Sequence, residues 1–206
     1  ALGRDFFGPI DIILNNAAIT HIGLFPEVSG AQFHKVMDVN LFGAVNVTKA
    51  VLPDLLVRKG SIITVSSVAG LAPLMGRTAY AASKFALHGF FESLRTELKS
   101  KGIRVLMVCP STIDTDMRSR ALSGAVEDQA VGKTASPEEI AKGIYEAWIL
   151  RKHQLIIGPQ AKLTVLIRRW MPRLYDRLMS RKVQPQMEAL QQKDKESNMF
   201  KDKMLK

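Results

Sequence analysis

The sequence predicts an α/β protein in which helices cover both faces of a parallel sheet. Short apolar runs rich in β-branched residues alternate with stretches of helical spacing, which is the pattern of a parallel sheet with crossover helices. The 206 residues are 47% hydrophobic and 23% charged, a balance typical of a globular core. This length corresponds to one sizeable domain, and the composition excludes intrinsic disorder for most of the chain.

The first half of the chain contains two predicted strands and two predicted helices. Residues 10–14 form an apolar run closed by two asparagines, which predicts a buried strand. Residues 30–57 carry apolar side chains at three- and four-residue steps, which predicts a long helix that Pro53 interrupts near its end. Residues 61–65 predict the next strand, and residues 78–100 predict a second long helix.

The alternation continues in the second half. Residues 103–109 predict a third buried strand, whereas residues 111–135 lack strong periodicity and predict a mobile segment. Ser136 is expected to cap a helix, because a serine, a proline and two acids in that order are typical of a helix N-terminus. Residues 155–157 predict a last short strand. The expected α/β domain therefore spans residues 1–160.

The C-terminal quarter differs from this domain in charge and pattern. Residues 1–150 carry 15 Lys+Arg against 14 Asp+Glu, whereas residues 151–206 carry 14 against 5. Residues 161–183 place apolar side chains on one helical stripe flanked by arginines, and Pro172 is expected to kink or split this helix. Residues 184–206 are polar and lack a core pattern, which predicts a flexible tail.

Two interpretations of the basic helix at residues 162–183 remain open. In one, Trp170 and its apolar neighbours dip into lipid while the arginines meet anionic head groups. In the other, the helix covers the substrate cleft or a sheet edge with its basic face in water. Nucleic acid is not an expected partner, because the stretch lacks a groove-reading motif. With no apolar run of membrane-spanning length and no recognisable secretory leader, we expect a cytoplasmic protein, peripherally membrane-associated under the first interpretation.

The thiol and imidazole side chains give no sign of a metal centre. The single cysteine, Cys109, excludes an internal disulfide and is interpreted as inert core at the end of a strand. The four histidines are scattered without partner spacing, and they are assigned neither metal binding nor other chemistry: His21, His34, His88 and His153. We therefore expect no metal site.

The candidate catalytic residues are Ser67, Tyr80, Lys84 and Asn40. Tyr80 and Lys84 are four residues apart on a predicted helix, so both side chains lie on one face. An ammonium beside a phenol lowers the tyrosine pKa towards the range of a general acid or base. Ser67 follows a strand end, where its hydroxyl could orient a substrate carbonyl. Asn40 lies in a helix interior, so either a functional role, such as holding a relay water, or a backbone hydrogen bond explains it.

A lone Tyr-x-x-x-Lys occurs by chance in many helices and identifies no family. Between residue 10 and about residue 160, however, this chain contains a whole set of motifs in a fixed order: Asn15-Asn16-Ala17-Ala18, Asn40, Ser67, Tyr80-Ala81-Ala82-Ser83-Lys84 and the Pro110-to-Thr115 turn. This set resembles the short-chain dehydrogenase/reductase family. The resemblance implies a Rossmann-like, doubly wound parallel sheet, present here as its C-terminal, catalytic half.

The resemblance implies NAD(P)-dependent interconversion of an alcohol and a carbonyl. Tyr80 would exchange a proton with the substrate oxygen, which Ser67 would hold. Lys84 would lower the pKa of Tyr80 and bond the nicotinamide ribose, and Asn40 would complete a proton relay through water. The expected cofactor is NADP, with NAD as the alternative, and the residues expected to contact it are Asn15, Asn16, Ala17, Ala18, Tyr80, Lys84, Pro110, Ile113 and Thr115.

Three departures from the family pattern shape the expectation. Ala18 and Ser111 stand where the family usually has glycine. The family's glycine-rich phosphate loop, G-x-x-x-G-x-G, does not occur in these 206 residues. We therefore expect the C-terminal part of a longer enzyme. In this chain alone, the strand at 10–14 would become an exposed apolar sheet edge, and the chain should bind dinucleotide poorly or not at all.

The expected substrate is a small hydrophobic alcohol or ketone, such as a lipid or steroid. The segment 111–135 should close over it and offers four apolar side chains: Ile113, Met117, Leu122 and Val126. The resemblance also implies a homodimer or tetramer built on the helix at 78–100. The alternative hypothesis is a truncated, non-catalytic form that acts as an interaction or membrane-peripheral protein.

Overall fold

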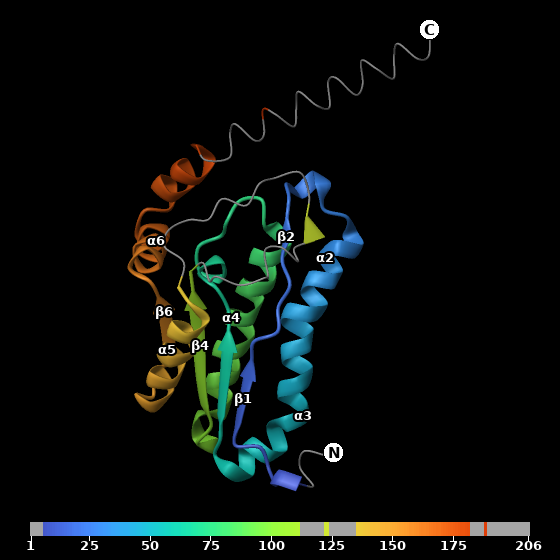
Figure 1. The fold of residues 1–206 in the computed structure, drawn as a ribbon, viewed down its shortest axis with the longest axis vertical. Coiled ribbons are helices and arrows are strands. Elements are labelled where there is room, and N and C mark those ends of the chain that lie inside the picture. The colour runs from blue at the N-terminus through green and yellow to red at the C-terminus, as the bar shows by residue number, and fades with distance from the viewer. Residues whose placement is uncertain (1–5, 112–121, 124–134, 182–187, 189–206) are drawn as a thin grey trace. The chain divides into compact units, whose positions relative to one another are not determined.

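The computed structural model describes residues 6–111, 122–123, 135–181 and 188. Its main sheet consists of four strands in the order β1-β3-β4-β6 (Figure 1), with bounds Ile12–Asn15, Ser61–Val65, Arg104–Pro110 and Gln154–Ile157. Each neighbouring pair is parallel; Ile12 lies opposite Ser61, and Ser61 lies opposite Arg104. The predicted α/β class with a parallel sheet is confirmed.

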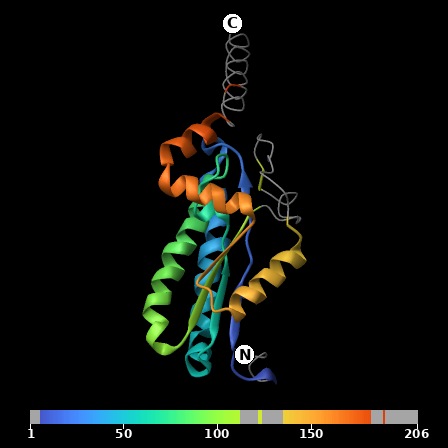
Figure 2. The ribbon, with the colours of Figure 1, turned by 90° about the vertical axis from the view of Figure 1, so that its left-hand side faces the viewer.

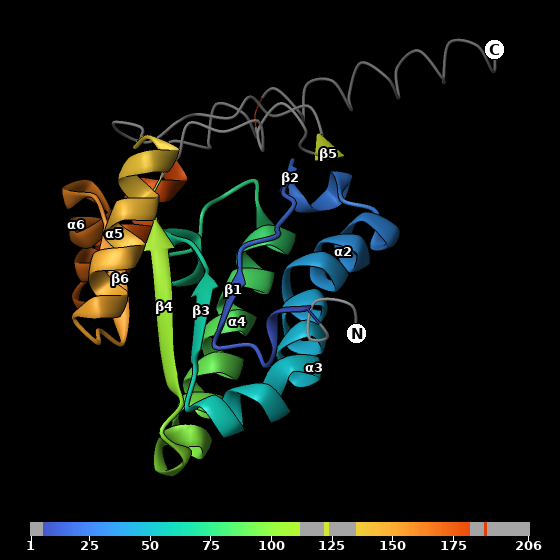
Figure 3. The ribbon, with the colours of Figure 1, turned by 60° about the horizontal axis from the view of Figure 1, so that its bottom comes forward.

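A second, two-stranded parallel pair lies beyond the carboxyl ends of the main strands (Figure 3). It joins β2, His21–Ile22, to β5, Leu122–Ser123. The remainder of the segment 112–134, where a mobile stretch is predicted, lies outside the described residues. β2 therefore lies beyond the carboxyl ends of the main strands, where ligands of open α/β folds bind.

The predicted helix at 30–57 is one helical run with an irregular middle. It comprises α2 (Gly30–Met37), a π-helical turn (Asp38–Phe42) and α3 (Gly43–Arg58). The expected interruption at Pro53 is wrong, because α3 continues to Arg58. Pro53 lies on an exposed side of the helix, where the missing N–H costs least.

Helices cover both faces of the sheet (Figure 2). α3 and α4 (Thr78–Leu98) pack on one face, where Leu55, Leu87 and Phe91 meet Ile62 and Met107. α5 (Pro137–Ile149) packs on the other face, where Ala147 and Trp148 meet the second side of β3 and β4. A sheet buried on both sides explains why its central strands read as continuous apolar runs.

β1 is less covered than the strands beside it. Ile13 belongs to the core under α3 and α4, but Ile12 and Leu14 point to the opposite face and are 42% and 52% exposed. Among the strands that the structure describes, β1 pairs only with β3. The expected apolar edge at this strand is therefore present in the described fold.

The predicted cap at Ser136 and the predicted split at Pro172 are both confirmed. Ser136 accepts a hydrogen bond from the Glu139 backbone N–H and the Glu139 carboxylate accepts one from the Ser136 N–H, so α5 begins with a capping box. α6 (Pro159–Trp170) ends before Met171, and a further helical segment follows at 172–181, as the split at Pro172 predicts.

The chain divides into two compact units, residues 1–165 and 166–206. The first contains both sheets. Within the described residues of the second, Arg168 lies over the Tyr175 ring at 5.8 Å from its centroid. No helix in the described part of the chain is long and apolar enough to cross a membrane.

Candidate active site

Three of the predicted catalytic side chains meet at the carboxyl end of β3. Tyr80 and Lys84 lie one turn apart on α4, and both are buried, at 7% and 2% exposure. Ser67 follows β3 and caps the short 3-10 turn η3 (Val68–Gly70), where its Oγ accepts a hydrogen bond from the Ala69 N–H at 3.1 Å. This hydrogen bond holds the Ser67 side chain within the turn between β3 and α4.

Burial raises the pKa of Tyr80 above its ordinary value, while the nearby Ser67 side chain and the charge of Arg77 oppose the rise. The Arg77 guanidinium lies 6.0 Å from the centroid of the Tyr80 ring. This direction differs from the expectation that Lys84 brings the pKa of Tyr80 down, because desolvation of the phenol outweighs the cations near it.

Lys84 is directed at the end of β3. Its Nζ donates to the Val65 carbonyl oxygen at 2.9 Å and lies 5.6 Å from the centroid of the Tyr80 ring. Burial lowers the pKa of Lys84 to about 8. An ammonium has three N–H donors, and Val65 is its one hydrogen-bond acceptor among the described residues. The remaining donors can bond the hydroxyls of a ligand.

Asn40 lies in the π-helical turn and is 1% exposed. Its Oδ1 accepts from the Ile19 N–H at 2.8 Å, and its Nδ2 donates to the Ile19 carbonyl at 3.0 Å and to Ser83 Oγ at 2.9 Å. Ser83 Oγ in turn donates to the Tyr80 carbonyl at 2.8 Å. Asn40 thus joins the loop after β1 to the backbone of α4 through Ser83, and both of its N–H donors are used.

The loop after β1 is more exposed to solvent than Tyr80 and Lys84. The Asn15 amide turns towards α3, where its Nδ2 donates to Thr48 Oγ1 at 3.0 Å. Asn16 and Ala17 are exposed, and Ala18 is half-buried. Asn15 therefore positions the start of the loop, and the next residues present their surface at the carboxyl edge of the sheet.

The other expected cofactor contacts come from the end of β4. Pro110 is the last residue of that strand and is buried, whereas Ile113 and Thr115 lie outside the described residues. The spare donors of Lys84, beside the end of β3, suit the ribose hydroxyls of a dinucleotide. These residues fit that end of the cofactor, and no phosphate loop occurs among them.

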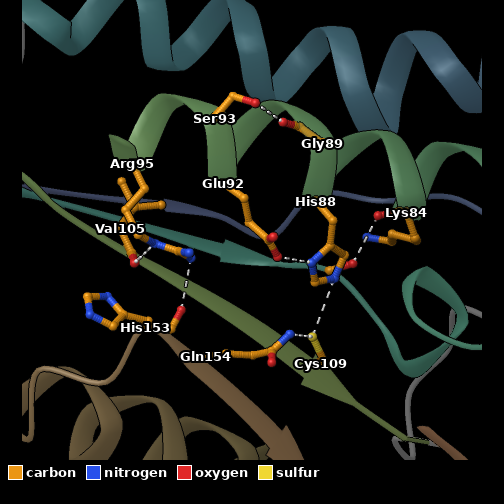
Figure 4. Close-up of polar contacts among 11 residues, drawn as sticks. Lys84, His88, Gly89, Glu92, Ser93, Arg95, Val105, Cys109, His153 and Gln154 are labelled. Atoms are coloured by element: carbon orange, nitrogen blue, oxygen red, sulfur yellow. Dashed lines mark hydrogen bonds and ion pairs between the residues drawn. The ribbon is translucent and has the colours of Figure 1, made fainter. Parts of the chain in front are cut away.

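The structure adds a buried polar group that the sequence interpretation missed. His88 Nδ1 lies 2.8 Å from Glu92 Oε1, and His88 Nε2 lies 3.5 Å from Cys109 Sγ (Figure 4). The expectation that no histidine has a partner at useful spacing is therefore wrong for His88. The signal was available, since His88 and Glu92 are four residues apart on a helix.

The comparisons with known proteins point to one family. A family model described as short chain dehydrogenase matches residues 3–125. Dehydrogenase/reductase SDR family member 7B of Bos taurus is 34% identical over 181 residues, which are 84% of this chain and 56% of that protein. Dehydrogenase/reductase SDR family protein 7-like of Drosophila melanogaster is 34% identical over 183 residues, 85% and 56% of the two chains. The chain spans about half the length of these curated relatives.

Solved structures agree on the fold. A short-chain dehydrogenase from Streptomyces avermitilis superposes with a TM-score of 0.74 at 26% identity, over 90% of this chain and 74% of that one. A 4-hydroxyisoleucine dehydrogenase complexed with NADH gives a TM-score of 0.63 at 27% identity, over 76% and 71% of the two chains. The predicted Rossmann-like, doubly wound sheet is confirmed by this likeness.

Proposed function

Because the chain belongs to the short-chain dehydrogenase family, we propose that its site interconverts a hydroxyl and a carbonyl group, with NADP as cofactor and NAD as the alternative. The observation that carries the proposal is the buried pair of Tyr80 and Lys84, one helical turn apart on α4, with Ser67 beside Tyr80 on the turn after β3. A bound nicotinamide would supply or accept the hydride.

In this mechanism Tyr80 exchanges a proton with the substrate oxygen. With its pKa raised by burial, Tyr80 is a phenol at neutral pH and is prepared to donate to a carbonyl. The Ser67 hydroxyl forms a second hydrogen bond with the same substrate oxygen. Lys84 uses its spare N–H donors for the cofactor ribose, and Asn40 bonds the relay water through the remaining lone pair of Oδ1.

Cofactor contacts are proposed for the strand-end residues at the same edge. The loop residues Asn15, Asn16, Ala17 and Ala18 would line the cofactor beside β1, and Pro110, Ile113 and Thr115 would meet the nicotinamide beyond β4. The support is positional, since ligands of doubly wound folds bind outside the carboxyl ends of the strands.

The substrate is proposed to be a hydrophobic alcohol or ketone. Leu122, which is expected to line the substrate site, pairs with His21 in the small sheet beyond the strand ends. His21 is buried, and its Nε2 has no hydrogen-bond partner among the described residues. One unsatisfied imidazole nitrogen near this strand pair suits a mainly apolar molecule that carries a second polar group.

Fluorescence titration of the 206-residue chain with NADPH and with NADH tests the cofactor assignment. Because these 206 residues contain no glycine-rich phosphate loop, weak binding is the expected result, tighter for NADPH and weakened further in Lys84→Met but not in the exposed-site control Lys142→Met. Equal affinity in Lys84→Met would contradict the ribose contact. A folded chain that binds neither dinucleotide would mean that this chain alone does not perform the proposed reaction, and would favour the second candidate.

The second candidate is a non-catalytic protein that lies on a membrane surface or binds a partner. Exposed apolar side chains on α6 and the helical segment after it favour it: Leu163, Leu166, Trp170, Met171 and Leu178 are 57%, 54%, 72%, 53% and 40% exposed. Basic side chains accompany them, as in an interfacial helix. Cosedimentation with vesicles that contain phosphatidylserine, lost in Trp170→Glu and absent with pure phosphatidylcholine, is the expected result.

A homo-oligomer through α4 is also proposed. Phe85 on this helix is 42% exposed although its neighbours along the helix enter the core. A large apolar side chain on an otherwise packed helix is typical of a subunit interface. Sedimentation velocity should show a dimer or tetramer that Phe85→Lys dissociates; a monomeric parent chain would exclude this interface.

A further inference from the structure

We propose that His88 is a positioning residue, which sets the spacing between the helix that carries Tyr80 and Lys84 and the turn that carries Ser67. The inference deepens the proposed function, because it concerns the same site. Its basis is a line of polar contacts through His88, from Glu92 to Cys109 and Gln154 (Figure 4).

The imidazole of His88 is held at both nitrogens. Glu92 Oε1 lies 2.8 Å from Nδ1, and an ionised carboxylate only accepts hydrogen bonds, so the Nδ1 proton faces Glu92. In the neutral ring Nε2 then offers a lone pair, and Cys109 Sγ lies 3.5 Å from it. The thiol is the donor that this lone pair needs.

The chemistry of Cys109 suits a donor. Burial raises the pKa of its thiol to about 12, so the sulfur keeps its proton at neutral pH. Gln154 Nε2, from β6, donates to the same sulfur at 3.9 Å. Donors and acceptors therefore alternate from Glu92 on α4 through β4 to β6, and the ring of His88 is fixed against two strands of the sheet.

A Cys-His-Glu spacing also occurs in nucleophilic enzymes, but it does not have that role here. Cys109 Sγ belongs to a residue with 0% exposure, and its raised pKa removes the thiolate that a nucleophile requires. The Glu92 side chain, at 49% exposure, is the end of the line that reaches solvent. The group is built to hold the ring and not to attack a substrate.

The fixed ring contacts the turn that carries Ser67. A Cβ placed on Gly70 would lie 3.0 Å from His88 Cδ2, 2.8 Å from the Lys84 carbonyl oxygen and 2.6 Å from Ser66 Oγ. Helix and turn thus meet without room for a methyl group. The Gly70 N–H donates to the Ser67 carbonyl at 3.0 Å, so a displaced ring would displace Ser67 as well.

Substitutions can separate the polar line from simple packing. His88→Phe keeps a ring beside Gly70 but removes both nitrogens. Cys109→Ala removes the donor to Nε2, whereas Cys109→Ser retains a hydroxyl that can donate. Phe91→Leu is the matched control, because Phe91 is fully buried on the same helix but belongs to the apolar core and not to the polar line.

The readout is the pKa of Tyr80, measured by tyrosinate absorbance after rapid alkaline mixing and assigned by subtracting the trace of Tyr80→Phe. The Ser67 side chain lowers the pKa of Tyr80, and a displaced Ser67 stabilises the phenolate less, so His88→Phe and Cys109→Ala should raise this pKa by about half a unit. Cys109→Ser should restore the parent value, and Phe91→Leu should leave it unchanged despite a lower melting temperature.

An unchanged Tyr80 pKa in folded Cys109→Ala would overturn the inference, and so would an equal shift in Phe91→Leu. If His88→Phe does not fold, the Cys109 pair still decides the outcome. The titration needs neither cofactor nor substrate. Full turnover in Tyr80→Phe would contradict the proposed function while the result for His88 stands.

Discussion

The centre and the edge of one parallel sheet differ in how the chain secures them. In β3 all five residues are buried, and the side chains around its end are joined by hydrogen bonds within the chain. In β1 alternate residues are exposed, and Asn16 and Ala17 in its following loop are exposed too. Groups proposed to move a proton are therefore fixed by neighbours in this chain, whereas groups proposed to bind the cofactor lie at an open edge. Substitutions should affect the two regions differently.

The largest effect is expected at the catalytic centre. Tyr80→Phe removes the proposed acid without changing the ring, so kcat for carbonyl reduction should fall by a factor of about 10²–10⁴. Tyr145→Phe, at a site 63% exposed on α5, is the control and should keep the parent rate. Steady-state kinetics measures both. Parent-like turnover in Tyr80→Phe would contradict the proposed role of Tyr80 as the proton donor.

Two glycines measure how closely the centre is packed. Gly70→Ala forces a methyl group against a backbone oxygen and should lower the free energy of unfolding by about 2–4 kcal/mol. Gly89→Ala adds the same methyl on α4 where nothing lies within 4 Å, and should raise it by about 0.5–1 kcal/mol. Urea unfolding of both variants tests this, and equal effects would mean that the turn can yield.

Neighbouring residues of β1 test the edge. Ile13→Ala opens the core under α3 and should cost about 2–4 kcal/mol. Leu14→Ala changes the half-exposed face and should cost less than about 1 kcal/mol. Chemical denaturation at several protein concentrations measures each. A cost at Leu14 that grows with concentration would show that another copy covers this face.

Lys84 should give a smaller effect than Gly70 or Ile13, and one that depends on pH. Its pKa is about 8 in the folded state against an ordinary value of 10.5, so the unfolded chain binds more protons between these values and stability rises with pH there. Lys84→Met should be more stable than the parent by about 1–2 kcal/mol at pH 7, with the difference shrinking towards pH 10.

Urea unfolding of Lys84→Met at pH 7 and at pH 9.5 measures this difference. Lys142→Met, at an exposed position on α5, is the control and should show no such trend. A Lys84→Met variant that gains no stability at pH 7 would mean that the ammonium is better solvated than its 2% exposure indicates.

The strands and helices could be predicted because their patterns are local. Residues 61–65 and Ser136 were found as predicted, since a β-branched run and a capping sequence each determine their own backbone. The π-helical turn at Asp38–Phe42 could not be predicted, because its apolar spacing reads as a regular helix and the wide turn depends on contacts of Asn40 with distant residues. Pro53 was misjudged because its cost depends on exposure.

The sequence predicts which residues form the candidate site better than it predicts their pKa values and contacts. The spacing of Tyr80 and Lys84 on a helix places them together whatever surrounds them. The pKa direction of Tyr80 depends on burial by the whole fold, which no local motif carries. His88 was missed for a related reason: Glu92 is near in sequence, but Cys109 becomes its neighbour only when β4 packs against α4.

The wide turn at Asp38–Phe42 also changes the direction in which the side chains after it point, within one helical run. In a regular helix each residue advances the rotation by about 100°, so Asn40 would lie over Val51, whose side chain enters the apolar core. The extra residue in the turn shifts everything after it by about one such step. One rod can thereby turn an amide towards α4 and aliphatic side chains towards the sheet. Deleting a single residue between 38 and 42 would bring both functions onto one stripe, and either the amide or the core would lose its place.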